Sequence, residues 1–389
     1  MKFALVAHGL PPSPYVQSVM IRRLLHGLNP DDYCLITQTY GDHSPMRNYP
    51  GEKLPAKHYY MPRWLNFERG VRFSLIRWSN VLMRALQIAR IIKREKCEAV
   101  VACTSELFDL PAAYLASRLT GVKFYPYLFD YYSQMATGTQ GERFANRLEP
   151  VMLKGAAGII VPNEFLRDDL RERYGVESTV IHNPCDLSVY ETAPPYDGSL
   201  RGGGEIRIGY TGSIYHAHFS AFWNLLAAIE SVKEWNIKLH IYTNQPPALL
   251  AENGIKGPVV INDPVPAAAI PGIQWASDLL FLPLAFNALH PGVIRTSAPG
   301  KLGEYLASRR PILVHVPEDS FPAWYFREYE CGLVVTEDDP SKVREAIEAI
   351  LTDANLRRKL VRNAWERAQS DFGIPASQRA FASLMELKV

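Results

Sequence analysis

The chain has 389 residues, of which 47% are apolar and 21% are charged, as is usual for a folded globular protein. One hydrophobic core rarely serves a chain of this length, so two domains are expected. The formal net charge of +2 gives no strong positive field, which argues against a nucleic-acid-binding protein.

Membrane spans, a secretory leader and disulfides are not expected either. The longest apolar runs, such as AAAIPGI and LLFLPLAF, are short and interrupted by proline. The amino-terminal stretch MKFALVAHGLPPSP has too short an apolar core for a signal peptide and is interpreted as a first strand. Five cysteines show no CxxC spacing, which fits reduced thiols in the cytoplasm: Cys34, Cys97, Cys103, Cys185 and Cys331.

In chain order, short apolar runs alternate with helical patterns, which is typical of parallel α/β architecture. The first half contains the predicted strands KFALVAH, YCLITQ, EAVVAC, KFYPYLF and GIIVP, with helices between them such as 16–28 and 71–94. A second series contains EIRIGYTG, KLHIYT, PVVIND, LLFLPL, PILVHV and CGLVVT. Helices end the chain, and the first of them has Asp339 as its expected N-cap and Pro340 in its first turn.

A segment rich in glycine, proline and charge, PPYDGSLRGGGE, separates the two series of strands. This composition predicts a linker, so we place the domain boundary near Pro194–Glu205. The expected fold class is α/β, with one Rossmann-like domain over residues 1–193 and a second over 205–365. Ligands of such open parallel sheets bind at the carboxyl ends of the strands, so we expect functional residues in the loops that follow them.

A loop with two glycines follows the first strand of the second series. Residues 209–213 read GYTGS and precede a predicted helix around 221–232. Glycine lets the backbone approach a ligand closely, and a helix N-terminus offers unpaired N–H groups to a phosphate. The alternative interpretation is a tight strand–helix turn with no ligand.

The segment TSAPGKLGEYLASRRP, residues 296–311, is more specific. Pro299 and Gly300 predict a turn into a short helix, with Lys301 and Glu304 on one face of its first turn. A lysine there can neutralise a diphosphate, and a glutamate can accept hydrogen bonds from both hydroxyls of a ribose. The alternative is a surface ion pair that contributes a few tenths of a kcal/mol.

The second half resembles the donor domain of GT-B glycosyltransferases, in particular the large retaining family 4. The run PGKLGEYLASRRPI is similar to the family's P-x-K-x-x-E-Y-L-A-x-x-x-P-I, and ASDLLFLPL and CGLVVTEDDPSKVREAIEAIL resemble neighbouring elements. In the first half, NRLEPVMLKGAAGIIVPNEFLRDDL and VIHNPCDLSVY are also similar to family segments. The resemblance covers nearly the whole chain. It implies two Rossmann-like domains facing a central cleft, with residues 366–389 packing back on the first domain.

The same resemblance implies an activity. A sugar would move from a nucleotide-diphosphate-sugar to an acceptor hydroxyl with retention, without a cofactor or metal. Polysaccharide or lipid-linked glycan synthesis is the expected role, and a small-molecule acceptor is the alternative. Two other functions stay open. One is a nucleotide-sugar 2-epimerase of the same fold, and the other is a non-catalytic nucleotide-sugar-binding partner of another transferase.

Donor-site roles follow from the resemblance residue by residue. Glu304 matches the glutamate that holds the nucleotide ribose, Gly212 matches the glycine facing the diphosphate, and Ala298, Pro299 and Gly300 match the turn beside the transferred sugar. This chain departs from the family in having Thr296 where another glutamate is common, and Ser213 and His218 where an arginine and a lysine are common. Positive charge for the diphosphate is therefore expected from Lys301 together with Arg295.

Acceptor-side candidates lie in the first half. Asp130 follows the strand KFYPYLF, where family members often carry a histidine or aspartate, and could deprotonate the acceptor hydroxyl. The alternative is an N-cap or a solvated loop carboxylate. Ser13 is expected as the N-cap of a helix with Pro14 in its first turn. Weaker acceptor-side candidates are His8, Gly9 and Tyr131, and residues 132–141 are expected to form a loop that could close over substrate.

Residues 63–96 are strongly basic, with nine lysine and arginine residues against two glutamates, and aromatic residues are interleaved with them. Such a segment can rest on the anionic inner surface of a membrane, so a cytoplasmic protein that is peripheral on the membrane is expected. The alternative is a core helix with solvated cations, whose apolar residues follow helical spacing: Val71, Leu75, Trp78, Leu82, Ala85, Ala89 and Ile92.

Overall fold

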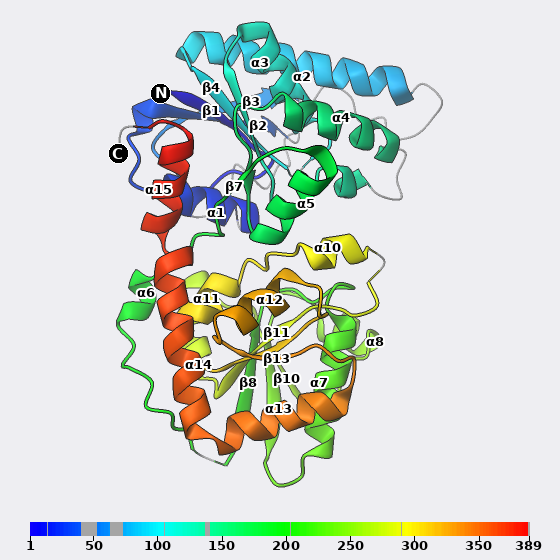
Figure 1. Cartoon of the computed structure of the whole chain (residues 1–389), viewed down its shortest axis with the longest axis vertical. Coiled ribbons are helices and arrows are strands. Elements are labelled where there is room, and N and C mark those ends of the chain that lie inside the picture. The colour runs from blue at the N-terminus through cyan, green and yellow to red at the C-terminus, as the bar shows by residue number, and fades with distance from the viewer. Residues whose placement is uncertain are drawn as a thin grey trace. The chain divides into compact units, whose positions relative to one another are not determined.

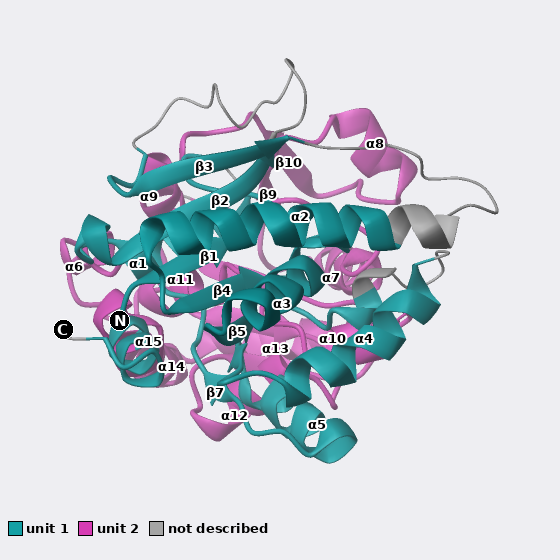
Figure 2. Ribbon diagram, turned by 90° about the horizontal axis from the view of Figure 1, so that it is seen from above, with its two compact units in different colours: residues 1–184, 377–389 teal, residues 185–376 magenta. Residues whose placement is uncertain are grey.

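The computed structural model describes residues 1–13, 15–39, 53–62, 73–104, 106–136, 141–202, 204–288 and 290–387. The chain divides into two compact units (Figure 2). Unit 1 comprises Met1–Pro184 and Ser377–Val389, and unit 2 comprises Cys185–Ala376. Each unit contains a parallel sheet flanked by helices, which confirms the predicted α/β class with two Rossmann-like domains.

The described part of unit 1 contains a parallel sheet in the order β3-β2-β1-β4-β5-β6-β7. Its strands are β1 (Phe3–Val6), β2 (Tyr33–Thr39), β3 (Lys57–Pro62), β4 (Ala99–Cys103), β5 (Lys123–Tyr127), β6 (Ile160–Val161) and β7 (Thr179–Val180). Its helices are α1 (Val16–Leu25), α2 (Phe73–Glu95), α3 (Asp109–Thr120), α4 (Glu142–Lys154), α5 (Glu164–Tyr174) and α15 (Ile374–Leu384).

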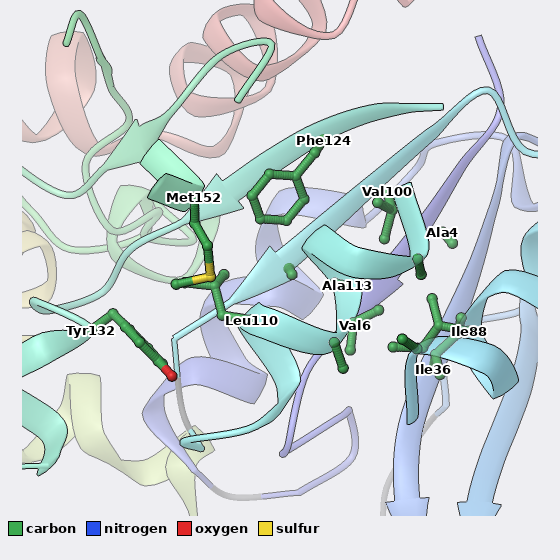
Figure 3. Packing of buried hydrophobic residues seen from close by; sticks show 14 of the residues in the cluster. Ala4, Val6, Ile36, Ile88, Val100, Leu110, Ala113, Phe124, Tyr132 and Met152 are labelled. Carbon is green, nitrogen blue, oxygen red and sulfur yellow. The ribbon is translucent and has the colours of Figure 1, made fainter. Parts of the chain in front are cut away.

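Successive side chains of β1 point to opposite faces of the sheet and enter two different apolar layers. Ala4 and Val6 lie in one layer, together with residues of α2 and α3 (Figure 3). Ile88 of α2 and Ala113 of α3 are fully buried in it. This layer holds α2 and α3 on one face of the sheet.

The last helix of the chain contributes to the opposite layer of unit 1. The ring of Phe3 meets the ring of Phe381 of α15 edge-on, with centroids 5.6 Å apart, and both residues are buried. Gln378 of α15 donates its side-chain N–H groups to the carbonyl oxygens of Leu24 and His26, at 3.2 Å and 2.5 Å. Unit 1 is therefore assembled from two segments that are far apart in the sequence.

Unit 2 contains a second parallel sheet, in the order β10-β9-β8-β11-β12-β13 (Figure 1). Its strands are β8 (Ile206–Thr211), β9 (Ile237–Tyr242), β10 (Val259–Asn262), β11 (Leu279–Pro283), β12 (Ile312–His315) and β13 (Leu333–Val335). Its helices are α6 (Ser188–Glu191), α7 (Phe219–Ser231), α8 (Pro247–Glu252), α9 (Ile270–Trp275), α10 (Pro291–Arg295), α11 (Leu302–Ala307), α12 (Phe321–Glu328), α13 (Pro340–Thr352) and α14 (Ala354–Arg367).

The strand order of unit 2 reverses direction at β8. The chain adds β9 and β10 on one side of β8, and then β11, β12 and β13 on the other. Loops that follow β8 and β11 must diverge at such a switch point, which is where open α/β sheets bind ligands. The residues that follow β8 and β11 are therefore the first place to look for a site in this unit.

The segment predicted as a linker lies inside unit 2. The chain passes from unit 1 to unit 2 at Pro184–Cys185, whereas the composition predicts a boundary at 194–205. Arg357 of α14 donates its Nε–H to the carbonyl oxygen of Gly198 at 2.8 Å, which ties this segment to unit 2. Its glycine and proline content thus reflects an irregular path along unit 2.

Two predicted helix caps can be compared directly with the structure. Asp339 caps α13 as predicted, because its carboxylate accepts a hydrogen bond from the N–H of Ser341 at 2.8 Å. The prediction that Ser13 caps the next helix is wrong, since α1 begins at Val16 with Tyr15 as its N-cap. Ser13 instead accepts a long hydrogen bond of 3.4 Å from the N–H of Tyr15.

The cysteines and the helices can be compared with the expectations of reduced thiols and of no membrane-spanning segment. All five cysteines are buried free thiols in the structure. Cys34 and Cys97 lie close together, with their sulfur atoms 3.9 Å apart. Within the described residues, no helix combines the length and the apolar character needed to cross a membrane.

Candidate active site

The turn after β8 is shaped around a glycine. Gly212 has a φ of 122°, a conformation that residues with a side chain rarely adopt, and it is exposed. A Cβ atom added at Gly212 would lie only 3.3 Å from Nζ of Lys301. The predicted loop glycine and the predicted lysine are therefore neighbours, and glycine is what allows the lysine to approach the backbone so closely.

Lys301 is held at the start of α11. Its carbonyl oxygen accepts the N–H of Tyr305 at 2.9 Å, which begins the helix. Its Nζ lies 3.6 Å from the centre of the Tyr210 ring, in a cation–π contact. The side chain retains partial access to solvent. An ammonium group in this place can reach a ligand that sits on the exposed turn at Gly212.

The charge of Lys301 depends on its surroundings. Burial lowers the pKa of its ammonium group to about 7, and the charge of Glu304 opposes this shift. Part of the side chain is accessible to water, which makes the shift smaller. A bound diphosphate would favour the charged form and draw a proton onto Lys301.

His218 is buried at the N-cap of α7. Its Nδ1 accepts the N–H of Tyr215 at 3.5 Å, which places the ring proton on Nε2. Burial and the nearby charge of Lys301 lower the pKa of His218 to about 3. The residue is therefore neutral and cannot replace the cation that family members often carry in this region, although its Nε2–H group can donate a hydrogen bond.

The other predicted donor-site residues lie between α10 and α11. Arg295 ends α10 and is half-buried, and Glu304 is half-buried in the first turn of α11. Thr296 is buried, and its hydroxyl donates to the carbonyl oxygen of Gly292 at 3.1 Å. That hydrogen bond occupies the hydroxyl proton within its own turn, so Thr296 does not take over the chemistry of a carboxylate.

The turn before α11 runs through Ala298, Pro299 and Gly300, which are partly exposed. The carbonyl oxygen of Pro299 accepts the N–H of Leu302 at 2.9 Å, which closes the turn predicted from the proline–glycine pair. The structure thus brings Gly212, Lys301 and the turn at 298–300 into one edge of unit 2.

Three side chains that sequence reasoning does not single out support this edge. Tyr210 is fully buried, and its hydroxyl donates to the carbonyl oxygen of Ser213 at 2.8 Å. The hydroxyl of Tyr305 accepts the N–H of Thr211 at 3.3 Å. Gln245, in the loop after β9, bonds to both the N–H and the carbonyl of residue 214, at 2.6 Å and 2.7 Å. The sequence offers a signal only for Tyr210, an aromatic residue at the end of a predicted strand.

Three acceptor-side candidates follow β1 in unit 1. His8 is half-buried, and its carbonyl oxygen accepts the hydroxyl of Thr37 at 2.8 Å. A Cβ atom added at Gly9 would lie 2.9 Å from Oγ of Ser18 in α1, so glycine is needed for α1 to pack there. Ser13 is buried next to the same helix. These residues shape the start of α1 at the carboxyl edge of the sheet.

Asp130 and Tyr131 follow β5 at the same edge. Asp130 is exposed. Loss of hydration raises the pKa of its carboxyl group to about 6, but solvent reaches the side chain, so a smaller shift is expected in solution. It is ionised at neutral pH in either case. Tyr131 is buried, and its hydroxyl donates to the Asp169 carboxylate, which leaves Asp130 as the more accessible of the two.

A buried polar network lies next to these residues. Nη1 of Arg84 and Nε2 of Gln38 both donate to Oδ1 of Asp109, each at 2.9 Å. Oδ2 of Asp109 and Oε1 of Gln38 are buried without a hydrogen-bond partner. Burial, followed by the charge of Glu106, raises the pKa of Asp109 to about 7. A proton on Asp109 would give the unpartnered Oδ2 a hydrogen to donate.

Metal ligands were not expected from the sequence. Among the residues that the structure describes, no three His, Cys, Asp or Glu side chains are grouped so that they could hold a metal ion. Positive charge at this edge of unit 2 comes from two side chains, Lys301 at the start of α11 and Arg295 at the end of α10.

Two family profiles match the chain. That of Glycosyltransferase Family 4 matches residues 17–189, and that of Glycosyl transferases group 1 matches residues 205–353. Among curated proteins, none matches the chain.

Several solved structures are similar over almost their whole length. A glycosyltransferase from Rickettsia africae ESF-5 has a TM-score of 0.67 at 14% identity, covering 100% of this chain and 99% of that one. Sucrose-phosphate synthase from Thermosynechococcus elongatus has a TM-score of 0.70 at 14% identity, covering 99% and 98%. HepE from Anabaena, in complex with UDP and glucose, has a TM-score of 0.66 at 14% identity, covering 99% of each chain.

These matches define the class of the protein. Identity this low shows the fold alone, and that fold is GT-B. Together with the two family profiles, it shows that the chain belongs to the GT-B glycosyltransferases and is a family 4-like member, an enzyme that transfers a sugar. The resemblance seen in the sequence is confirmed.

Proposed function

We propose that the enzyme takes its sugar from a nucleoside-diphosphate sugar bound by unit 2 and transfers it to a hydroxyl of an acceptor bound by unit 1. The observation that carries this proposal is the ammonium group of Lys301, placed beside the exposed turn at Gly212 after the central strand β8. A cation next to open backbone suits a diphosphate. The structure of HepE in complex with UDP-glucose gives further support, since its fold is the same.

In the proposed reaction, the acceptor oxygen attacks the anomeric carbon, and the bond from that carbon to the diphosphate oxygen breaks. The nucleoside diphosphate leaves with the bonding electrons, and Lys301 and Arg295 stabilise its developing charge. Asp130, which is exposed and ionised, accepts the proton of the acceptor hydroxyl. Glu304 holds the ribose. The configuration of the sugar is retained because the acceptor oxygen attacks from the same face that the nucleoside diphosphate leaves.

Charge stabilisation by side chains makes the proposed reaction independent of a metal. Lys301 and Arg295 take the place that a divalent cation has in other transferases. Turnover should therefore be unchanged by a chelator, and Lys301→Ala should lower it by more than about tenfold. An unchanged rate in Lys301→Ala would contradict the role given to that residue.

The donor is tested most directly by thermal stability. Purified protein is heated with a panel of nucleotides and nucleotide-sugars in the absence of metal. A ligand present at about 100 times its dissociation constant adds about 2.7 kcal/mol to the free energy of unfolding, which gives a clear rise in Tm. One nucleoside diphosphate should stabilise the wild type and the control Glu348→Ala, but not Glu304→Ala. Stabilisation by none of the ligands would argue for a different donor.

The acceptor is proposed to be a polysaccharide or a lipid-linked glycan. WaaG, a glycosyltransferase involved in lipopolysaccharide biosynthesis, has the same fold with a TM-score of 0.64 at 14% identity. Labelled donor incubated with cell-envelope extracts should yield a labelled glycan, and the anomeric configuration of the product shows whether transfer is retaining. A new sugar formed from donor alone would instead indicate an epimerase, and binding without turnover would indicate a non-catalytic partner.

Peripheral attachment to the cytosolic face of a membrane is also proposed, through α2. Trp78, Leu82 and Leu86 are exposed by 50%, 48% and 36% and lie four residues apart, so they form one stripe along the helix. Arg90 and Lys93 are exposed further along the same helix. An apolar stripe followed by cations suits the boundary of an anionic lipid layer.

The structure changes two details of the basic segment. Arg84 is buried and paired with Glu106 and Asp109, so it is not one of the cations available to lipid. The core-helix alternative is correct for Ala85, Ala89 and Ile92, which are buried in unit 1, whereas Trp78 and Leu82 of the same helix are exposed. Residues 63–72, which belong to the same basic segment, lie outside the described part of the chain.

Vesicle binding tests the membrane proposal. The protein should co-sediment with vesicles of phosphatidylethanolamine and phosphatidylglycerol, and less with phosphatidylcholine alone. Leu82→Ser should weaken the binding, whereas Leu249→Ser, which changes an equally exposed leucine of unit 2, should not. Equal binding by both variants would exclude the α2 stripe.

A further inference from the structure

The ammonium group of Lys301 rests on an aromatic ring. Its Nζ lies 3.6 Å from the centre of the Tyr210 ring, well inside the range of a cation–π contact. The charge of Glu304 also acts on Lys301 and favours its charged form. The ring attracts the cation and carries no negative charge of its own, so it does not pair with the ammonium group as a carboxylate would, and the charged form stays available to an anionic ligand.

Tyr210 is itself held in place. It is the residue before the last in β8 and is fully buried. Its ring packs edge-on against Phe222 of α7, with centroids 4.9 Å apart. A buried ring on a central strand cannot move far, so it offers a fixed platform for the flexible lysine side chain.

The hydroxyl of Tyr210 reaches the other part of the proposed diphosphate site. It donates a hydrogen bond of 2.8 Å to the carbonyl oxygen of Ser213, within the turn that contains Gly212. One side chain therefore contacts both the cation and the backbone turn. A change at this residue should alter the position of one relative to the other.

We propose that Tyr210 is a positioning residue that makes the site select a diphosphate over a monophosphate, because its ring holds Lys301 and its hydroxyl holds the turn at Ser213. This inference rests on the proposed nucleotide-sugar donor. Tyr210 is buried beneath the ammonium group and need not touch the ligand. Its effect is exerted through Lys301, so it should disappear when the lysine is absent.

A double-mutant cycle tests this dependence. Dissociation constants of UDP and UMP are measured by calorimetry for the wild type, Tyr210→Leu, Lys301→Met and the double variant, with another base if the thermal panel selects it. Tyr210→Leu should weaken UDP binding by about tenfold and UMP binding much less, since a cation–π contact is worth roughly a threefold to thirtyfold change in affinity. In the Lys301→Met background, the same substitution should have little further effect on UDP.

Two further variants separate positioning from stability. Tyr190→Phe removes a buried tyrosine hydroxyl of the same unit, which donates to Gln274 at 2.8 Å, and should leave both affinities unchanged. Difluorotyrosine in place of Tyr210 keeps the size and the hydroxyl but weakens the negative face of the ring. It should lower the preference for UDP even if Tyr210→Leu does not fold.

The outcomes distinguish the inference from the proposed function. Additive effects of Tyr210→Leu and Lys301→Met, equal losses for UDP and UMP, or no change with difluorotyrosine would overturn the role of Tyr210 while the donor assignment stands. A wild type that binds no nucleoside diphosphate at all would overturn both. Loss of diphosphate preference only while Lys301 is present would support the inference.

Discussion

Raising the pH from 7 to 8 should weaken nucleoside-diphosphate binding by about fivefold, because the empty site must take up a proton before Lys301 can pair with the ligand. Burial lowers the pKa of Lys301 to about 7, so at pH 8 most of the empty protein carries a neutral amine. A bound diphosphate raises that pKa again. Below about pH 6 the lysine is already charged, and its contribution to binding stays constant as the pH falls further.

Calorimetry in two buffers of different ionisation enthalpy measures the proton directly. At pH 8, up to about 0.9 proton should be taken up for each ligand bound, and fewer if water at the partly accessible side chain keeps its pKa higher. Lys301→Arg should bind without proton uptake, because a guanidinium group stays charged throughout this range. Proton release at pH 8, or the same uptake in Lys301→Arg, would refute the argument.

Three further predictions concern the stability of the protein, and one of them also concerns its affinity for UDP. The raised pKa of Asp109 means that the folded state holds its proton more tightly than the unfolded state. This group should therefore lower the free energy of unfolding by on the order of 2 kcal/mol as the pH rises from 5 to 7. Asp109→Asn should flatten that slope when Tm is measured against pH. Gly212→Ala places a side chain at a positive φ and close to Lys301. It should lower the free energy of unfolding by about 1 kcal/mol and should also lower the affinity for UDP. An unchanged affinity would count against the close approach of Lys301 to Gly212. Phe381→Ala removes a buried ring from the layer around Phe3. The free energy of unfolding measured in urea should fall by about 3–5 kcal/mol. A loss below about 1 kcal/mol would mean that α15 does not cover that layer.

The sequence predicts the strands that are buried on both faces. Runs such as AVVAC and LLFLP are continuous and apolar because helices cover both sides of a parallel sheet, and they appear as β4 and β11. The strand β3 escapes prediction because it lies at an edge and most of its residues are exposed or half-buried. The strand β7 escapes because its two residues are only half-buried and lie in no apolar run, whereas the equally short β6 is buried and lies within the run GIIVP.

The candidate site is predictable in its residue types but not in its contacts. The spacing of Lys301 and Glu304 points to a nucleotide, but it does not show that Gly212 lies beside the lysine, since this depends on the pairing of β8 with β11. Nor does it show that His218 is buried and neutral. The loss of charge at a histidine depends on the atoms packed around it, which a single sequence does not specify.

The position of α15 affects how the protein can be made. When the first 184 residues have left the ribosome, the face of the sheet around Phe3 still lacks the helix that covers it, because Phe381 is translated after the whole of unit 2. Unit 2 is continuous in sequence and can finish folding before unit 1. Until α15 has been translated, the nascent chain carries an open apolar face. The order of synthesis therefore lets unit 1 be completed only after unit 2.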